Sequence, residues 1–420
     1  MTGVSDAGIR KEGINKMRDM YYDVVIAGCG VAGLYTALRL GRDKKILMLS
    51  KEDLESCDSM LAQGGICVLH DENDYDSYFE DTMRAGHYEN RKESVDLMIR
   101  GSRAIIDDLL SLGVRFAKNP DGTLAYTREG AHSRPRICFH EDITGKEITT
   151  TLLSHVKKLT NVTIMEYTVM TDILVVNDHC CGMIAKTRDG ETLHIHAQDT
   201  VMATGGIGGL YEHSTNFPIL TGDACRIAEQ HGVELEHMDY VQIHPTCLYS
   251  KKPGRSFLIS ESARGEGAIL LNHKGERFVN ELLPRDVVTK AIHEEMEKEG
   301  VDHEFISFEN VPEEIIKGHF PHIYEKCLEE GYDILKEPAP IVPAQHYFMG
   351  GVHVDHDSET TMPHLYAVGE TSCNGVHGKN RLASNSLLES LVFAKRAAQK
   401  IELTQKGKEE HESNYHAACC

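Results

Sequence analysis

Arginine and histidine side chains that stand beside glycine or proline recur through the second half of the sequence. They occur in His244-Pro245-Thr246, Arg264-Gly265-Glu266-Gly267, Pro284-Arg285-Asp286, Gln345-His346 and Gly378-Lys379-Asn380-Arg381. Arginine can bind a carboxylate through two parallel hydrogen bonds, and histidine can donate a hydrogen bond or move a proton near neutral pH. Any one of these residues alone is more often a surface or helix-end residue. The set as a whole predicts a pocket for a dicarboxylate.

A glycine-rich turn near the start of the chain predicts a dinucleotide site. Tyr22–Ala27 is a short apolar run typical of a buried strand, and Val31–Leu40 has the composition of a helix. The turn has the G-x-G-x-x-G sequence Gly28, Cys29, Gly30, Val31, Ala32 and Gly33. The first glycine permits the tight bend, the second lets the backbone approach a pyrophosphate, and the third lets the helix pack on the sheet. The motif suits FAD and NAD equally, and the alternative is a glycine turn without a ligand.

Later features favour FAD over NAD. Lys51 follows the second predicted strand, Ile46–Ser50, where an acidic residue usually holds the ribose of NAD. Two further turns, Ala203–Gly206 and Ala367–Glu370, each follow a short apolar strand, as in flavoproteins with two dinucleotide folds. The last predicted helix, Ser386–Ile401, could direct its first N–H groups at a flavin carbonyl, where negative charge collects on reduction. The alternative there is an ordinary serine cap.

The elements that position these residues predict an α/β fold. We expect an FAD-binding, doubly wound parallel sheet of the two-dinucleotide-fold type with an inserted α+β capping domain. Val162–Val176 and Gly182–Ile195 should form a small antiparallel ribbon, and Ser94–Leu112 a helix. The predicted boundaries are an N-terminal extension at 1–20, the first part of the FAD-binding domain at 21–240, the capping domain at 241–345, its second part at 346–402 and a polar tail at 403–420.

Composition excludes several other classes of protein. The 420 residues include 44 Lys+Arg and 65 Asp+Glu, a formal net charge of −21, which argues against binding nucleic acid or an anionic membrane. The uncharged stretch Val24–Leu38 is broken by three glycines and is too short to cross a bilayer. Twelve scattered cysteines without C-x-x-C spacing and without a signal peptide indicate the cytoplasm, and no metal site is expected.

On several blocks the sequence resembles the succinate dehydrogenase/fumarate reductase flavoprotein family, from about Tyr22 to about Ile401. The blocks are Ala62-Gln63-Gly64-Gly65, Thr221-Gly222-Asp223, His244-Pro245-Thr246, Arg264-Gly265-Glu266-Gly267-Ala268, Pro284-Arg285-Asp286 and Asn380–Leu387. Arg128–Arg134 is most similar to the branch that oxidises L-aspartate. Ala224 stands where glycine usually follows Thr-Gly-Asp. Family members usually continue into a C-terminal helical domain without a counterpart here, which leaves the oligomeric state open.

The resemblance implies a role for individual residues. The FAD contacts would be Cys29 to Ala32, Lys51, Asp58, Ser59, Ala62, Gln63, Gly64, Gly65, Asp223, Glu370, Ser386 and Leu387, together with Thr204 and Gly205 of the second glycine turn. The substrate contacts would be Glu129, His244, Ser260, His346 and Arg381. Glu129 would pair with the substrate ammonium, because succinate-type enzymes carry a neutral residue there. Asp58 stands where membrane succinate dehydrogenases carry the flavin-linking histidine, so FAD should be non-covalent.

The implied reaction oxidises L-aspartate to iminoaspartate with FAD, with oxygen or fumarate as electron acceptor, in the first step of quinolinate and NAD synthesis. Arg285 would transfer the proton through a relay with Glu261 and Arg264. Functional coupling to quinolinate synthase would follow from that step. One alternative is a soluble fumarate reductase or succinate dehydrogenase flavoprotein, and another is a non-catalytic FAD-binding regulator. Glu129 argues against the first and the cation set against the second, whereas the absent C-x-x-C argues against a disulfide reductase.

Overall fold

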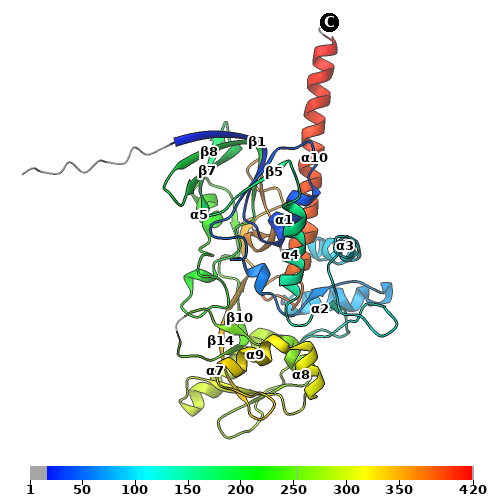
Figure 1. The fold of residues 1–420 in the computed structure, drawn as a ribbon, viewed down its shortest axis with the longest axis vertical. Helices are drawn as coiled ribbons and strands as arrows, with labels where there is room; N and C mark the ends of the chain where they lie inside the picture. The colour runs from blue at the N-terminus through cyan, green and yellow to red at the C-terminus, as the bar shows by residue number, and fades with distance from the viewer. Residues whose placement is uncertain (1–16, 253, 419–420) are drawn as a thin grey trace, which may run out of the picture.

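The computed structural model describes residues 17–252 and 254–418 (Figure 1). Its central element is a seven-stranded sheet of order β5-β2-β1-β8-β7-β6, in which β16 also pairs with β8. The strands are β1 Met17–Ala27, β2 Ile46–Leu49, β5 Val162–Met165, β6 Thr168–Val176, β7 His179–Thr187, β8 Thr192–Met202 and β16 Leu365–Ala367. The β1–β2, β1–β8, β2–β5 and β8–β16 pairs are parallel, and the β6–β7 and β7–β8 pairs are antiparallel. The predicted parallel sheet is confirmed, with an antiparallel extension at one edge.

The first strand–helix–strand unit follows from its local sequence. Val24, Val25 and Ile26 of β1 have no exposed surface, as expected for a parallel strand covered on both faces. β1 ends at the glycine turn, α1 spans Val31–Arg39, and β2 returns parallel to β1. Of the predicted N-terminal extension, residues 17–20 belong to β1, and residues 1–16 lie outside the described part of the chain.

The predicted division of the ribbon into two strands is wrong. Val162–Val176 is two strands, because Tyr167 between them has a φ of 53° and turns the chain, so that β5 joins the parallel sheet. Gly182–Ile195 is also divided, because Gly190 has a φ of 84° and closes a hairpin between β7 and β8. The short apolar strand expected before the Ala203–Gly206 turn is the end of β8, which finishes at Met202. The ribbon therefore has three strands, β6, β7 and β8.

Helices cover both faces of the sheet. Helices α1, α3 (Lys92–Ser111), α4 (Thr144–Val156) and α10 (Ser386–Ala418) share one apolar core with one face of β1 and β2 (Figure 1). Helix α5 (Asp223–Gln230) shares a second core with the other face and the ribbon. Helix α2 (Tyr75–Ala85) packs beside α3. Within the described residues, no helix combines the length and the apolar character needed to cross a membrane.

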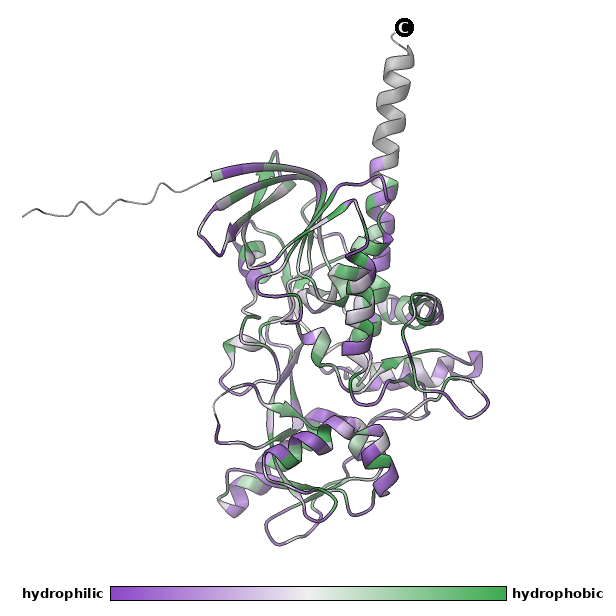
Figure 2. Cartoon of the chain, viewed as in Figure 1, coloured by the Kyte–Doolittle hydropathy of each residue, from purple (hydrophilic) through white to green (hydrophobic). Residues whose placement is uncertain are grey.

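A second, antiparallel sheet forms the inserted cap. Its order is β11 (Phe257–Leu258), β10 (Val241–Leu248), β14 (Ala339–Phe348), β13 (Glu304–Ser307) and β12 (Ile269–Leu271). Around a separate core it packs with α6 (Glu261–Gly265), α7 (Arg285–Glu299), α8 (Glu313–His319) and α9 (Pro321–Glu329). The chain enters the cap on β10 and leaves it on β14, which are neighbours, so both connections lie side by side. In Figure 2 the cap helices mix polar and apolar residues, as expected for helices with one solvent face.

Short elements complete the fold between these two parts. They are β3 (Ile66–Cys67) paired with β4 (Ile137–Cys138), the small sheet of β9 (Leu235–Glu236), β15 (Gly351–His353) and β17 (Ser372–Cys373), and the 3-10 turns η1 (Asp58–Leu61), η2 (Glu72–Asp74), η3 (Gly208–Leu210) and η4 (Gly369–Thr371). Two of these turns, η1 and η4, contribute residues to the cavity described next.

Candidate active site

One cavity lies between the carboxyl ends of the parallel strands and the cap. Every site residue predicted from the sequence lines this cavity, except Gly33 and Arg264. Gly33 lies within α1, and Arg264 follows the cavity-lining Glu261 one helical turn later on α6. In α/β folds this edge of the sheet is where ligands bind, because the strand ends and helix N-termini converge there.

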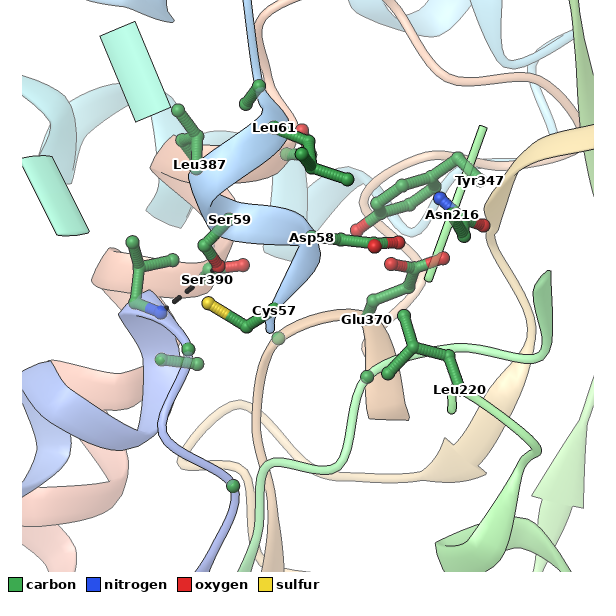
Figure 3. Close-up of a pocket in the computed structure, with 18 of the residues that line it drawn as sticks. Cys57, Asp58, Ser59, Leu61, Asn216, Leu220, Tyr347, Glu370, Leu387 and Ser390 are labelled. Atoms are coloured by element: carbon green, nitrogen blue, oxygen red, sulfur yellow. Dashed lines mark hydrogen bonds between the residues drawn. The ribbon is translucent and has the colours of Figure 1, made fainter. Parts of the chain in front are cut away.

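The glycine turn has the steric features of a pyrophosphate cradle. Gly28 has a φ of 117°, and a Cβ on it would lie 1.9 Å from the Ala203 carbonyl oxygen. A Cβ on Gly33 would lie 2.1 Å from the Gly28 carbonyl oxygen, so Gly33 acts through helix packing. Helix α1 starts without a side-chain cap and without an acidic residue in its first turn. Apart from the Val31 N–H, which donates to Ser59 Oγ at 3.1 Å (Figure 3), its N-terminal donors are left for an anion.

Lys51, which follows β2, forms an ion pair with a carboxylate from another element. Its Nζ lies 2.7 Å from Asp223 Oδ2 and donates to Thr221 Oγ1 at 2.9 Å. Asp223 is the first residue of α5 and also lines the cavity. A carboxylate from α5, paired with Lys51, therefore lies in the cavity beside the residue that follows the second strand. It is available to accept a hydrogen bond from a ribose hydroxyl.

Two carboxyl groups point toward one another on the far side of η1. Figure 3 shows the side chains of Asp58 and Glu370 facing each other near Tyr347. Asp58 Oδ1 accepts from the Phe217 N–H at 2.9 Å, and Oδ2 has no hydrogen-bond partner within the described chain. Burial raises the pKa of Asp58 to about 7, and burial together with the charge of Asp58 raises the pKa of Glu370 to about 8. Near neutral pH the pair therefore holds protons and can donate hydrogen bonds as well as accept them.

Another part of the cavity wall carries donors without a partner among the described residues. His244 Nδ1 accepts from the Thr246 N–H at 3.2 Å, which assigns its proton to Nε2, a buried atom without a partner among the described residues. His346 Nδ1 lies 2.7 Å from Thr215 Oγ1, and the two imidazole rings are 5.1 Å apart. Arg381 NH1 donates to Ser386 Oγ at 2.8 Å, and its Nε has no partner within the described chain.

Burial and a neighbouring positive charge lower the pKa values of these three groups. Burial, and next to it the charge of Arg285, holds the pKa values of His244 and His346 well below their usual range. The same two causes lower the pKa of Arg381 to about 10. Groups that would each gain from a counter-charge thus surround one space. A dicarboxylate would supply that charge, with Ser260, whose Oγ lies at the start of α6, as a further contact.

Arg285 lies at the start of α7 and is fixed on two sides. Its Nε donates to Glu261 Oε2 at 2.5 Å, and its NH1 donates to Gln242 Oε1 at 2.9 Å. Arg264 NH2 lies 3.4 Å from the same Glu261 oxygen, and Arg264 is 2% exposed. Although burial opposes it, the charges of Arg285 and Arg264 hold the pKa of Glu261 below its usual range. The three residues form a continuous charged chain from the cavity wall into the cap.

Glu129 reaches the same space from the large domain. Its Oε1 accepts from Ser262 Oγ at 2.8 Å and its Oε2 from Ser384 Oγ at 2.5 Å. A Cβ on Gly64 would lie 2.2 Å from Glu129 Oε1, so glycine is needed there for the carboxylate to fit. Burial, and next to it the charge of Glu261, raises the pKa of Glu129. The carboxylate is 3% exposed and faces a cavity whose lining also includes Arg285 and Arg381.

Several residues that shape the site were not predicted. Gln242 is the clearest, because its Nε2 donates to Asn380 Oδ1 at 2.8 Å and to the Arg381 carbonyl at 2.9 Å, which turns its Oε1 toward Arg285. Tyr347 lies under the Arg381 guanidinium at 4.4 Å from its ring centroid. The serine hydroxyls on Glu129 were also missed, although Ser384 stands within a block that the resemblance singled out.

Comparison with known proteins agrees with this geometry. Residues 23–387 match the family described as FAD binding domain. L-aspartate oxidase from Clostridium perfringens is 50% identical over 380 residues, which cover 90% of this chain and 86% of that one. L-aspartate oxidase from Clostridium acetobutylicum is 47% identical over 393 residues, 93% of this chain and 90% of that one. The chain belongs to the L-aspartate oxidase family.

Solved structures support the same assignment at the level of fold. A chain of E. coli quinol fumarate reductase superposes with a TM-score of 0.86 at 32% identity, over 92% of this chain and 70% of that one. A flavocytochrome c3 fumarate reductase in an open conformation has a TM-score of 0.71 at 22% identity, which shows the fold alone. The predicted resemblance, the fold class and FAD as the cofactor are thereby confirmed. The fumarate reductase alternative fits this member of the L-aspartate oxidase family less well.

Proposed function

We propose that the chain oxidises L-aspartate to iminoaspartate with non-covalently bound FAD in this cavity. The observation that carries the proposal is the placement of Glu129. It brings a buried carboxylate, held by serine hydroxyls and not by an arginine as Glu261 is, into the cavity that also holds His244, His346, Arg285 and Arg381. A ligand with two carboxylates and one ammonium matches that charge pattern, whereas succinate would leave Glu129 without a counter-charge.

The residues present fit FAD as the cofactor. The uncapped N-terminus of α1 and the glycine cradle suit a pyrophosphate, and Asp223 suits a ribose. The orphaned atoms Gln63 Oε1 and Asp58 Oδ2 would find partners on a polar cofactor. When bound, FAD would accept the hydride taken from the substrate. A carboxyl at position 58 in place of the linking histidine supports a non-covalent cofactor.

The chain's own residues would hold the substrate and manage its protons. Arg381 and His346 would bind one carboxylate, and His244 and Ser260 the other, so that the carbon skeleton is fixed between them. Arg285 would exchange the proton at the substrate carbon, with Glu261 restoring its protonation state and Arg264 linking Glu261 to the cap. The fixed geometry of Arg285 compensates for a guanidinium being a weak base, because it never has to be more than transiently deprotonated.

The remaining parts of the functional proposal concern partners and location. Oxygen or fumarate would reoxidise the cofactor, and the product would feed quinolinate and NAD synthesis through quinolinate synthase. The ten cysteines of the described chain are all unpaired, which favours a reducing cytoplasm.

A single experiment tests the proposal. The purified holoprotein should show a flavin spectrum that L-aspartate bleaches under anaerobic conditions. Succinate, which lacks the ammonium, serves as the matched control and should bleach the spectrum far more slowly. Bleaching by succinate and not by aspartate would establish the fumarate reductase alternative instead.

A further inference from the structure

Glu129 lines two cavities. The inner cavity holds the arginine and histidine side chains and the cofactor cradle, and the outer cavity is a second space on the side of the Arg128–Ser133 loop. The outer cavity is lined by Arg84, Arg128, Ala131, His132, Ser133 and Leu282 in addition to Glu129. Arg128 and Ser133 are exposed and Leu282 is 38% exposed, so the outer cavity reaches the protein surface. It lies where the loop that carries Glu129 meets the cap, since the Ala131 N–H donates to the Leu282 carbonyl at 3.0 Å.

The proposed reaction needs a second exit for protons. Converting the ammonium form of aspartate to the neutral imine or its enamine removes one hydride, which carries both electrons to FAD, and two protons. Whichever carbon gives the hydride, at least one proton leaves the nitrogen, because the neutral imine and the neutral enamine both carry fewer N–H bonds than the ammonium. The Arg285 relay serves the carbon end of this chemistry. A bound substrate under the cap would separate the amine from solvent on the inner side.

We propose that Glu129 accepts protons from the substrate ammonium and passes them to water in the outer cavity, which makes this cavity the amine-side proton exit. The nitrogen–hydrogen bond breaks, Glu129 is protonated, and water returns Glu129 to its ionised form. The inference rests on the proposed aspartate oxidation and names a residue and a route within it. It agrees with the raised pKa of Glu129, because a carboxylate of ordinary acidity is a weaker base.

The charges facing Glu129 come from several elements. They are Glu261 and Arg264 on α6, Arg285 on α7, Arg381 before α10, Arg84 at the end of α2, and Arg128 and His132 on its own loop. His132 stays neutral near physiological pH, since burial and Arg136 lower its pKa to about 4. Of the two carboxylates in this set, Glu129 is the one whose pKa is raised, whereas the pKa of Glu261 is held below its usual range.

The chain offers a matched pair of variants for the test. Leu282 lines the outer cavity and Leu283 does not, yet each is 38% exposed. The sequence has no tryptophan, so an indole introduced at either position reports its own surroundings by fluorescence. Leu282→Trp should fill the outer cavity and emit at shorter wavelength than Leu283→Trp. In the holoenzyme Leu282→Trp should lower kcat for aspartate about tenfold, whereas fumarate reduction, which involves no amine, should stay within about twofold.

A binding measurement gives a readout that does not depend on turnover. Succinate affinity for the oxidised holoenzyme, followed by flavin absorbance, should fall as pH rises through the Glu129 pKa, because an ionised Glu129 repels it. Displacing water from the outer cavity buries Glu129 further, so Leu282→Trp should move this pH break upward by about half a unit or more. Leu283→Trp should leave the break in place, and Glu129→Gln should remove it. If aspartate fails to bleach the flavin while the pH dependence of succinate affinity changes as stated, the proposed aspartate oxidation fails. The contact between Glu129 and the outer cavity would still stand.

Three results would overturn the proposal. One is equal loss of aspartate activity in both tryptophan variants, and another is an unchanged pH break in Leu282→Trp together with a blue-shifted indole. Should Leu282→Trp fold poorly, Glu129→Ala provides the second test, because formate at saturating aspartate should restore oxidation through the vacated outer cavity. No rescue by formate would then be the third contradicting result.

Discussion

Replacing Glu129 by Gln removes one charge from the site and almost nothing else. The amide has the same shape, its oxygen can still accept from Ser262 Oγ, and the Ser384 hydroxyl can turn to accept from the new NH2 group. The loss of binding is therefore confined to the counter-charge of the substrate ammonium, and the loss of the proton acceptor proposed above would add to it. A charge-assisted hydrogen bond in a site that is only 3% exposed contributes about 1.5–3 kcal/mol. Since about 1.4 kcal/mol corresponds to tenfold, kcat/KM for aspartate should fall roughly ten- to a hundredfold.

The assay compares two substrates in the same variant. Fumarate carries no amine, so its kcat/KM should hold steady or improve as a carboxylate repulsion disappears. In the wild type, aspartate oxidation should decline as pH falls through the raised pKa of Glu129, because protonation removes the charge, and the Gln variant should lack that decline. A parallel fall with both substrates would indicate a general structural fault. Unchanged kinetics with both would mean that Glu129 does not recognise the amine, and either result would refute the reasoning.

Four further predictions follow from the same contacts. Arg285→Lys and Arg285→Leu should each lower turnover at least about a thousandfold and leave FAD bound, because neither side chain can bridge Glu261 and Gln242; near-normal kcat in the Leu variant would contradict the assigned role. Acid precipitation of the holoprotein should leave the yellow colour in the supernatant, and a yellow pellet would show a covalent link. Gly64→Ala should reduce the preference for aspartate over fumarate, because the new Cβ would lie 2.2 Å from Glu129 Oε1 and would push the Glu129 carboxylate aside. An unchanged ratio of the two kcat/KM values would refute this. Asp58→Asn should raise the melting temperature of the FAD-free protein at pH 8, with the gain shrinking toward pH 4: burial raises the pKa of Asp58 to about 7, so the wild type loses stability as pH rises through that range, and a gain independent of pH would exclude this cause.

The cofactor cradle could be predicted because its requirements are local. Gly28 must be glycine for its own φ of 117° and for its approach to Ala203, and both needs act within one short turn between a strand and a helix. The division of the ribbon was missed although a local signal existed. Asp189-Gly190 is a strong hairpin dipeptide, and it falls inside a run whose alternating pattern continues across the turn. Periodicity alone therefore merged two strands that turn chemistry separates.

Gln242 shows the opposite case, in which no local signal exists. Nothing in the sequence around it within β10 marks it out. Its importance comes from its contacts with Asn380, which is 138 positions away in the chain, and with Arg285, which is 43 positions away. Only the folded chain brings β10, α7 and the segment before α10 together. The same holds for the serines on Glu129, one from the cap and one from the large domain. Sequence blocks could supply the residue types of the site, but the partners that orient them depend on tertiary structure.

The division of the site between two parts of the fold explains how one scaffold can serve related substrates. Arg285, Glu261 and His244 come from the cap, and in the proposed mechanism they would act on any dicarboxylate whose carbon skeleton lies beside the cofactor. Glu129 comes from a loop of the large domain and would add a requirement for an ammonium. Its fit depends on Gly64 and on two serine hydroxyls rather than on the relay in the cap. In the proposed mechanism, substrate choice and proton transfer at carbon would therefore rest on separate residues, so selection between aspartate and succinate-like ligands could change while the relay stays intact.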